Sequence, residues 1–174
     1  MKYCTFASPL EVEPKTSIEN IAKVEKITSD FLAEPITNYV YIITGPKENE
    51  KTALLSNVAN SLAKSDSWIV ANSNPNGQIL EEVASEIYKK AVAKRWFSKG
   101  EFSFSFQGVT FSLKGKEPVT TVISLIKKMV GYLNKKRKKV LITINEVDSI
   151  PEMKKFIQAY ESLIRQNFKI LLLI

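Results

Sequence analysis

The sequence has no histidine, and its only cysteine is Cys4. A disulfide framework, a zinc site with the usual ligands and a histidine-based catalytic triad are therefore excluded. Any catalysis must depend on carboxylates, lysines, hydroxyl groups or a bound metal ion.

Long apolar runs are also absent. No stretch approaches the roughly 20 apolar residues that a membrane-spanning helix needs. The N-terminal segment "MKYCTFASPLEVEP" does not have the apolar stretch of a signal peptide. We therefore expect a cytoplasmic protein without a membrane partner.

The apolar content is sufficient for one sizeable core. Of the 174 residues, 44% are hydrophobic, which favours a single core over two full domains. We expect an N-terminal segment with a leading helix over residues 1–38, followed by the core over residues 39–174.

The net charge of +7 comes from one stretch of the chain. Residues 127–139, "KKMVGYLNKKRKK", hold seven of the 25 basic residues and no acidic one, so the other 18 basic residues match the 18 acidic residues. Two interpretations stay open for this run. Residues 135–139 could bind nucleic acid, or they could be solvated cations that complement the dipole at the end of a helix.

Segments with strand patterns and segments with helix patterns alternate along the chain. Short runs rich in β-branched and aromatic residues predict strands, and stretches with apolar residues at helical spacing predict helices. The predicted strands are "NYVYIIT", "SWIVANS", "VLITINE" and "FKILLLI"; the predicted helices are "SIENIAKVEKITSDFL", residues 51–64, "QILEEVASEIYKKAVAKRWF", "EPVTTVISLIKKMVGYLNKKR" and "PEMKKFIQAYESLIRQN". This alternation indicates an α/β fold, with helices on both faces of a parallel sheet.

The tract "EFSFSFQGVTFSLKG" interrupts the alternation of strands and helices. Its apolar residues recur with period two on either side of a turn near Gln107 and Gly108, which predicts a β-hairpin. The aromatic face of this hairpin is expected either to pack on the sheet or to serve as a partner-binding edge.

The stretch "GPKENEKT", residues 45–52, lies between the first predicted strand and a predicted helix. Gly45, Lys51 and Thr52 have the spacing of a phosphate-binding loop, G-x-x-x-x-G-K-[ST], in which backbone N–H groups and a helix N-terminus point at phosphate. The lysine of such a loop reaches the terminal phosphates, and the hydroxyl binds magnesium. The candidate nucleotide-binding residues are Gly45, Pro46, Lys47, Asn49, Glu50, Lys51, Thr52 and Ala53.

A second motif is the apolar strand "VLITINE", which ends in the polar pair Asn145 and Glu146. Together with the loop, it makes the chain resemble the prokaryotic AAA-type ATPases, which are P-loop proteins. The resemblance runs from about Tyr39 to Ile174 and is carried by "IITGPKENEKTALL", "FSFSFQGVTFS", "EPVTTV" and "VLITINEV".

This resemblance implies a three-layer P-loop NTPase-like sheet, flanked by helices and carrying an inserted β-hairpin. The last strand, "FKILLLI", would lie between the loop strand and the "VLITINE" strand. A sensor residue, an arginine finger, a further core strand and a helical lid would follow Ile174, so we expect the chain to be truncated before them.

The resemblance also implies ATP and Mg²⁺ as cofactors. Lys51 would contact the β- and γ-phosphates, Thr52 would bind the metal, Asn145 would be a weak outer-shell ligand of the metal through a water molecule, and Glu146 would be the catalytic residue that activates water. Asp148, two residues further on, is expected to cap the following helix.

Two residues depart from the family's motifs. Glu50 stands where the second glycine of the loop is expected; a carboxylate about 5 Å from one phosphate charge would cost roughly 3 kcal/mol at an effective dielectric of about 20. Asn145 stands where an aspartate is expected, and it lacks the anionic charge that hard cations favour.

We therefore expect an ATP-binding, AAA-type ATPase-like domain whose hydrolysis is weakened or lost. The alternative is a non-catalytic P-loop scaffold that binds protein or nucleic acid. The expected partners are a nucleotide, a protein partner or a second copy of the chain, and nucleic acid.

Overall fold

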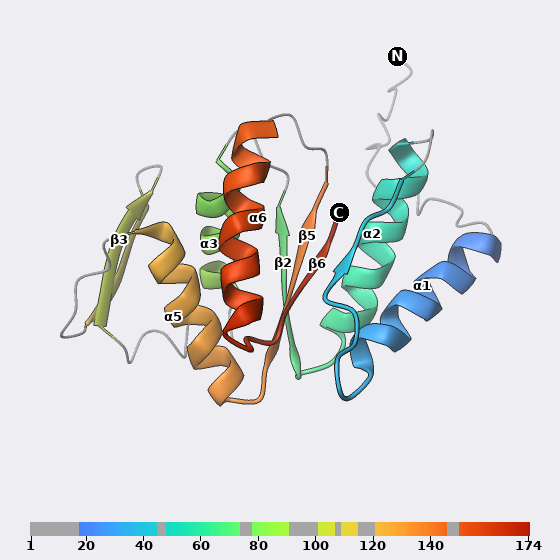
Figure 1. Cartoon of the computed structure of the whole chain (residues 1–174), viewed down its shortest axis with the longest axis horizontal. Helices are drawn as coiled ribbons and strands as arrows, with labels where there is room; N and C mark the ends of the chain where they lie inside the picture. Colours follow the sequence, from blue (N-terminus) through green and yellow to red (C-terminus); the bar gives the residue numbers. More distant parts are fainter. Residues whose placement is uncertain are drawn as a thin grey trace, which may run out of the picture.

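The computed structural model describes residues 18–44, 48–73, 78–90, 101–106, 109–114, 121–145 and 150–174. These residues form an α/β fold with one parallel sheet and a separate β-hairpin (Figure 1). The helices are α1 (Ile18–Leu32), α2 (Glu48–Ala63), α3 (Ile79–Lys89), α5 (Val122–Lys135) and α6 (Ile150–Arg165). The strands are β1 (Val40–Tyr41), β2 (Trp68–Ser73), β3 (Glu101–Phe106), β4 (Val109–Lys114), β5 (Lys139–Ile144) and β6 (Ile170–Leu173).

The parallel sheet has the strand order β1-β6-β5-β2. Each strand of the sheet pairs in parallel with its neighbours, so every connection between them crosses over a face of the sheet through a helix. The last strand, β6, lies between β1 and β5, and this placement confirms the position that the sequence resemblance implied.

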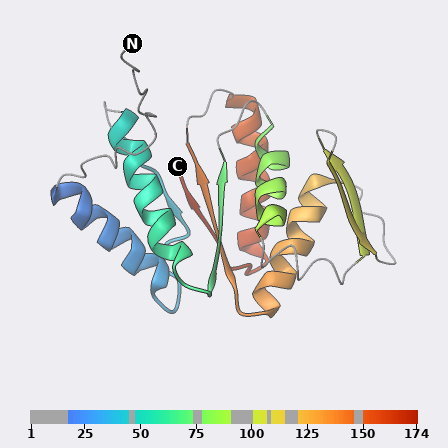
Figure 2. The same ribbon diagram turned by 180° about the vertical axis from the view of Figure 1, so that it is seen from behind.

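Helices cover both faces of the sheet, as predicted. In Figures 1 and 2, α1 and α2 lie on one side of the strands, and α3, α5 and α6 lie on the other. Neighbouring residues of one strand face opposite sides, because side chains alternate along a strand. Leu141, for example, joins the core under α1 and α2, whereas Ile142 joins the core under α3, α5 and α6.

The leading helix α1 is part of the core beside α2. Its residue Phe31 is fully buried and packs edge-on against the ring of Tyr41, with 5.3 Å between the ring centroids. The Tyr41 hydroxyl also donates a hydrogen bond to the carboxylate of Asp30. Burial of the hydroxyl, reinforced by this bond, raises the pKa of Tyr41.

The helix α6 is tied to the sheet by Tyr160. Its hydroxyl donates to the carbonyl oxygen of Tyr39 at 2.7 Å and lies 3.0 Å from the carbonyl oxygen of Ile170. Because the side chain is buried, the pKa of Tyr160 is raised far above its ordinary value. This one hydroxyl therefore connects α6, β6 and the segment that leads into β1.

The strand β1 is a short edge strand with one apolar surface left open. The carbonyl groups of Tyr39 and Tyr41 accept hydrogen bonds from β6 and the residue that follows it, and Ile43 donates to the carbonyl of Ile174. The intervening residues Val40 and Ile42 therefore direct their backbone polar groups away from β6. Their side chains are 41% and 69% exposed.

The predicted hairpin is confirmed as β3 and β4, an antiparallel pair in which Phe106 is the partner of Val109. It lies beyond α5, at the end of the molecule opposite α1 (Figure 1). Its side chains lie outside the described part of the structure, so the predicted packing of its aromatic face stays a prediction.

The helix predicted over "QILEEVASEIYKKAVAKRWF" corresponds to α3 as far as Lys89, and residues 91–97 of the prediction lie outside the described residues. It stops at Lys89, because Lys90 has an extended backbone with ψ of 124°. Basic residues at this position complement the negative end of the helix dipole, and this stabilises a helix end. The apolar spacing that predicted a longer helix does not indicate where the helix ends.

Candidate functional site

The predicted nucleotide site lies at the carboxyl ends of the parallel strands, which is where open α/β sheets bind ligands. The strand β1 leads into α2, which carries Lys51 and Thr52, and Asn145 directly follows β5. In Figure 1 these carboxyl ends and the start of α2 point upward.

The structure brings Thr52 and Asn145 together, although 93 positions separate them in the sequence. The Thr52 hydroxyl donates a hydrogen bond to Oδ1 of Asn145 at 3.2 Å. The backbone N–H of Asn145 donates to the carbonyl of Ser73 at 3.1 Å, so Asn145 continues the pairing of β5 with β2. Thr52 is therefore held within α2, and Asn145 by a backbone hydrogen bond that extends the pairing of β5 with β2.

These two side chains bring two oxygens to one place but no negative charge. The Thr52 and Asn145 oxygens are 3.2 Å apart, which is a hydrogen-bond distance. Mg²⁺ usually takes one or two protein carboxylates together with substrate phosphates and water, whereas both oxygens here are neutral.

The helix α2 begins at Glu48, three residues before the predicted start. Asn49 and Glu50 therefore belong to the first turn of the helix and not to a loop that wraps around phosphate. Two acidic residues in the first turn favour this start because they complement the positive end of the helix dipole. A glycine at position 50, which would weaken the helix there, is missing.

The other predicted site residues fall into two groups. The Glu50 side chain is exposed, Lys51 is half-buried, and Ala53 is buried in the core. Residues that lie outside the described part of the chain are Gly45, Pro46, Lys47, Glu146 and Asp148.

A row of polar side chains beside Asn145 was not predicted. Thr143, two residues before Asn145 on the same face of β5, donates to Oδ1 of Asn72 at 2.9 Å. On the other face, the Ser73 hydroxyl donates to Oε2 of Glu82 at 3.1 Å. The Thr143 and Ser73 side chains are buried, so each hydroxyl requires the partner that it has.

The signal for this row was present in the alternation of the strands. In "VLITINE" the polar residues Thr143 and Asn145 are two positions apart, and "WIVANS" ends in the polar residues Asn72 and Ser73. Since strand side chains alternate between faces, this pattern places Thr143 and Asn145 on one side of the sheet.

Two further features bear on the predicted cofactor and partners. In the part of the chain that the structure describes, no three His, Cys, Asp or Glu side chains gather in a group that could hold a metal ion. None of the described helices has both the length and the apolar character needed to cross a membrane.

Comparisons with protein-family models, with curated proteins and with solved structures find no match. The geometry at the carboxyl ends of the strands is therefore the basis for the function proposed below.

Proposed function

We propose that this chain is an ATP-binding domain of the AAA-type, P-loop kind, with weakened or lost hydrolysis. The observation that carries the proposal is the hydrogen bond between Thr52 and Asn145. These are the two positions at which the sequence motifs predicted magnesium ligands, and they meet across the sheet.

The strand order supports this proposal. With β6 inserted between β1 and β5, one strand separates the end of β5 from the strand that leads into α2. Lys51 and Thr52, near the start of α2, thereby lie at the same end of the sheet as Asn145, where the strands have their carboxyl ends. A phosphate group bound there would meet the positive end of α2 and the ammonium group of Lys51.

The chain's own groups have separate roles in this site. Lys51 would neutralise the β- and γ-phosphates, and Thr52 and Asn145 would orient a Mg²⁺ ion bound to them. When bound, Mg²⁺ would supply charge neutralisation between the phosphates. Glu146 follows Asn145 directly and would accept a proton from the attacking water.

Two features weaken binding and hydrolysis. Asn145 contributes no negative charge to the metal, so the metal's affinity depends more on the nucleotide phosphates. Glu50 adds a carboxylate to the first turn of α2, where the positive end of the helix would otherwise favour phosphate. Both features reduce retention of Mg-ATP, while the proposed base remains.

A second candidate is a non-catalytic scaffold that binds a protein partner or nucleic acid. The early start of α2 favours it, because residues 48–50 are already helical. For either candidate we expect a cytoplasmic protein.

Calorimetric titration of the 174-residue chain with ATP, with and without Mg²⁺, separates these candidates. We expect Mg-ATP to bind with a micromolar dissociation constant, and Lys51→Ala to abolish this binding. Lys64→Ala is the matched control, because Lys64 is an exposed lysine just beyond the opposite end of α2.

Equal loss of binding in both lysine variants would mean that net charge, not the site, determines affinity. No heat with the unaltered chain would contradict ATP binding and favour the scaffold. Binding without release of phosphate would identify a nucleotide-binding domain that does not turn over.

A further inference from the structure

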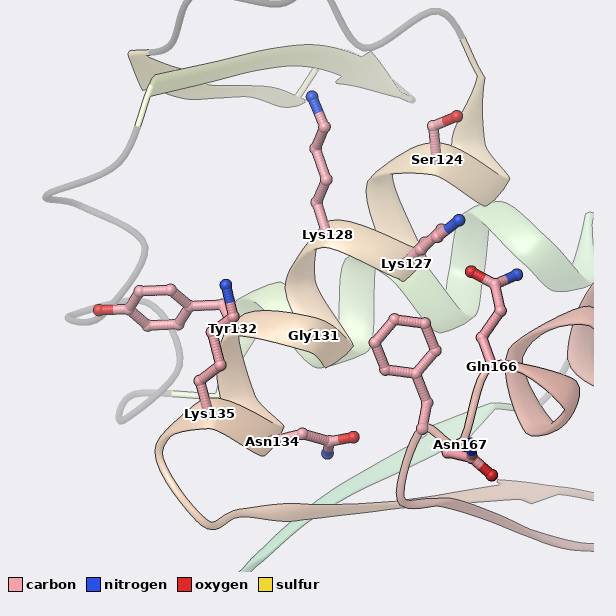
Figure 3. Close-up of a pocket in the computed structure, with 10 residues that line it drawn as sticks. Ser124, Lys127, Lys128, Gly131, Tyr132, Asn134, Lys135, Gln166 and Asn167 are labelled. Atoms are coloured by element: carbon pink, nitrogen blue, oxygen red, sulfur yellow. The ribbon is translucent and has the colours of Figure 1, made fainter.

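A groove lies at the opposite end of the molecule from the proposed ATP site. It has a volume of about 820 Å³ and runs between α5 and the turn that connects α6 to β6. In Figure 3, Lys127 of α5 points toward Gln166 of the turn, and Tyr132 points away from the turn. The lining residues are Ser124, Lys127, Lys128, Gly131, Tyr132, Asn134, Lys135, Gln166, Asn167 and Phe168.

The groove is positively charged. Of the ten described residues that line it, three are lysines, Lys127, Lys128 and Lys135, and none is acidic. Within the described part of the chain, no carboxylate forms an ion pair with Lys127 or Lys135. A ligand in this groove is therefore expected to be an anion.

A neighbouring cavity of about 580 Å³ differs from the groove in its charges. It shares Asn134 and Asn167 with the groove, but it also contains the carboxylate of Glu34. Glu34 lies 2.6 Å from the ammonium group of Lys139 and 3.7 Å from that of Lys169. Two of the three cationic side chains of this second cavity, Lys139 and Lys169, thus share one carboxylate within the fold, whereas Lys127 and Lys135 of the groove have no ion-pair partner among the described residues.

Within the basic run at residues 135–139, two lysines also have partners inside the fold. The Lys138 ammonium group donates to the backbone carbonyl of Asp66. Lys139 is paired with Glu34 and also lies over the ring of Trp68, 5.5 Å from its centroid. Lys138 and Lys139 are therefore engaged within the fold, and neither of them lines the groove.

The helix dipole explains only part of this charge. Lys135 is in the last turn of α5, where a cation is stabilised by the dipole. Lys127 lies eight residues earlier, which is about 12 Å along the helix. The dipole's effect is confined to the last turn, so it gives no reason for lysines at 127 and 128.

Aromatic rings and a fixed turn complete the groove. Phe168 packs closely against α5, because Gly131 has no side chain: a Cβ atom there would lie 3.1 Å from the ring. Tyr132 adds a second half-buried ring. Asn134 holds the turn in place, since its side chain donates to the carbonyl of Lys138 at 2.8 Å and accepts from the N–H of Lys169 at 2.7 Å.

We propose that this groove binds single-stranded nucleic acid, with Lys127 and Lys135 on the phosphates and Phe168 or Tyr132 against a base. Proteins that bind single strands combine a positively charged groove with aromatic rings on which bases stack. The groove has both, and its size suits a ligand of a few nucleotide units.

This proposal does not depend on ATP binding. The groove lies at the end where β5 begins, at Lys139, and the proposed ATP site lies where β5 ends, at Asn145. Six residues of strand separate these ends, or about 20 Å. Loss of one activity should therefore leave the other unchanged.

The test is fluorescence anisotropy of a labelled 20-nucleotide oligodeoxythymidine, titrated with the 174-residue chain over a range of salt concentrations. Binding is expected to weaken with added salt. In Lys127→Ala/Lys135→Ala, the slope of log affinity against log salt should fall by about 1.4, since each phosphate contact on a single strand contributes about 0.7. At 0.1 M salt that is about a 25-fold loss of affinity.

The matched control is Lys64→Ala/Lys154→Ala. It removes the same charge from exposed lysines that do not line the groove, one after α2 and one on α6. We expect its affinity to stay within about threefold of the unaltered chain. Lys51→Ala should likewise bind the oligonucleotide normally, so that failure of the ATP proposal is distinguishable from failure of this one.

Phe168→Leu tests the contribution of stacking separately from charge. Leucine keeps an apolar side chain beside the core, but it removes the ring. Affinity should fall about tenfold with an unchanged salt slope if Phe168 carries the stacking, and Tyr132→Leu should have this effect if Tyr132 carries it. Circular dichroism checks that each variant remains folded.

Three results would overturn the proposal. One is no binding of the oligonucleotide at 50 mM salt. A second is an equal loss of affinity in the groove variant and in its matched control. The third is displacement of the oligonucleotide by polyglutamate of the same length with equal efficiency, which would indicate an acidic protein partner.

Discussion

The hydroxyl of Thr52 and the side-chain oxygen of Asn145 lie 3.2 Å apart, across the carboxyl end of the sheet. One residue belongs to a helix and the other to the end of a strand, so this bond joins two layers of the fold. A phosphate-bound metal would have to be accommodated at this contact. The contribution of the hydrogen bond to stability and the effect of added charge at Asn145 can be tested independently.

Thr52→Val should lower the free energy of unfolding by about 1 kcal/mol, because it removes one partly buried hydrogen bond and keeps the shape of the side chain. Urea denaturation measures this. The matched comparison is Thr28→Val: the Thr28 hydroxyl is buried, and it has no hydrogen-bond partner among the described residues.

Valine at position 28 should therefore be neutral or stabilising, by up to about 1 kcal/mol. Equal destabilisation by both substitutions would show that the hydrogen bond of Thr52 contributes nothing specific.

Glu50→Gly combined with Asn145→Asp should increase the affinity for Mg-ATP by at least tenfold. The substitution at 50 removes a carboxylate from the positive end of α2, and that at 145 adds an anionic ligand beside Thr52. Calorimetry with both single variants and the double variant measures each contribution. Glycine in the helix should cost up to about 1 kcal/mol of stability, so unfolding is measured in parallel.

If the double variant gains no affinity, the segment around Gly45 does not have the geometry of a phosphate-binding loop. The proposal of an ATP site would then be wrong, while the fold and the groove beside α5 would be unaffected.

Tyr160→Phe should destabilise the protein by about 1 kcal/mol. The variant keeps the ring, which is buried against Phe156 with 6.1 Å between the centroids, and loses only the hydroxyl. Without it, the carbonyl groups of Tyr39 and Ile170 lose a buried donor. Tyr132→Phe, on the half-buried surface of α5, is the comparison and should have a smaller effect.

Glu34→Gln should remove a pH-dependent part of the stability. The hydrogen bond from Lys139, reinforced by the charges of Lys139 and Lys169, holds the pKa of Glu34 below its ordinary value of 4.5. The folded state therefore favours the charged carboxylate, and its stabilisation is present above pH 4.5 and is lost as the pH falls through the folded-state pKa.

Thermal melting from neutral to acidic pH tests this expectation. The melting temperature of the unaltered chain should exceed that of Glu34→Gln at pH 7, and the difference should disappear in acid. Glu161→Gln removes a carboxylate whose partner, Arg165, lies 3.5 Å away on the exposed surface of α6. It should have less effect at pH 7, because the Arg165 side chain is 81% exposed whereas Lys139, the partner of Glu34, is 11% exposed, and exposed ion pairs contribute little. A constant difference for Glu34→Gln at every pH would contradict the assignment.

The sheet could be predicted from the sequence because the residues of each strand indicate that both of its faces are buried. In "VLITINE", alternate residues supply the two cores, and parallel pairing follows from the helices between the strands. The resemblance to P-loop ATPases added the position of β6, and the structure confirms it.

The start of α2 and the end of α3 could not be predicted, because local backbone preferences overrode the motif spacing and the apolar spacing on which the predictions rested. The start of α2 depends on acidic residues at 48 and 50, which favour a helix where the motif required a loop. The end of α3 depends on the backbone of Lys90, whereas apolar residues continue at helical spacing beyond it.

The groove could not be predicted at all, because its walls come from distant parts of the chain. The sequence placed Lys127 and Lys135 on one helix, but the opposite wall consists of Gln166, Asn167 and Phe168. The pairing of Lys139 with Glu34, which takes one lysine out of the basic run, also joins residues far apart in the sequence. Such contacts follow from tertiary structure alone.

The open edge of β1 has a practical consequence for handling the protein. A strand whose outer backbone groups have no hydrogen-bond partner among the described residues, and whose apolar side chains are exposed, is a template on which another chain can add a strand. We expect the purified chain to aggregate through Val40 and Ile42 as its concentration rises, and Ile42→Lys to raise the concentration at which light scattering begins. Unchanged scattering in that variant would mean that the chain aggregates through another surface. A clearly higher concentration at the onset of scattering would make Ile42→Lys the better sample for titrations with ATP and with the oligonucleotide.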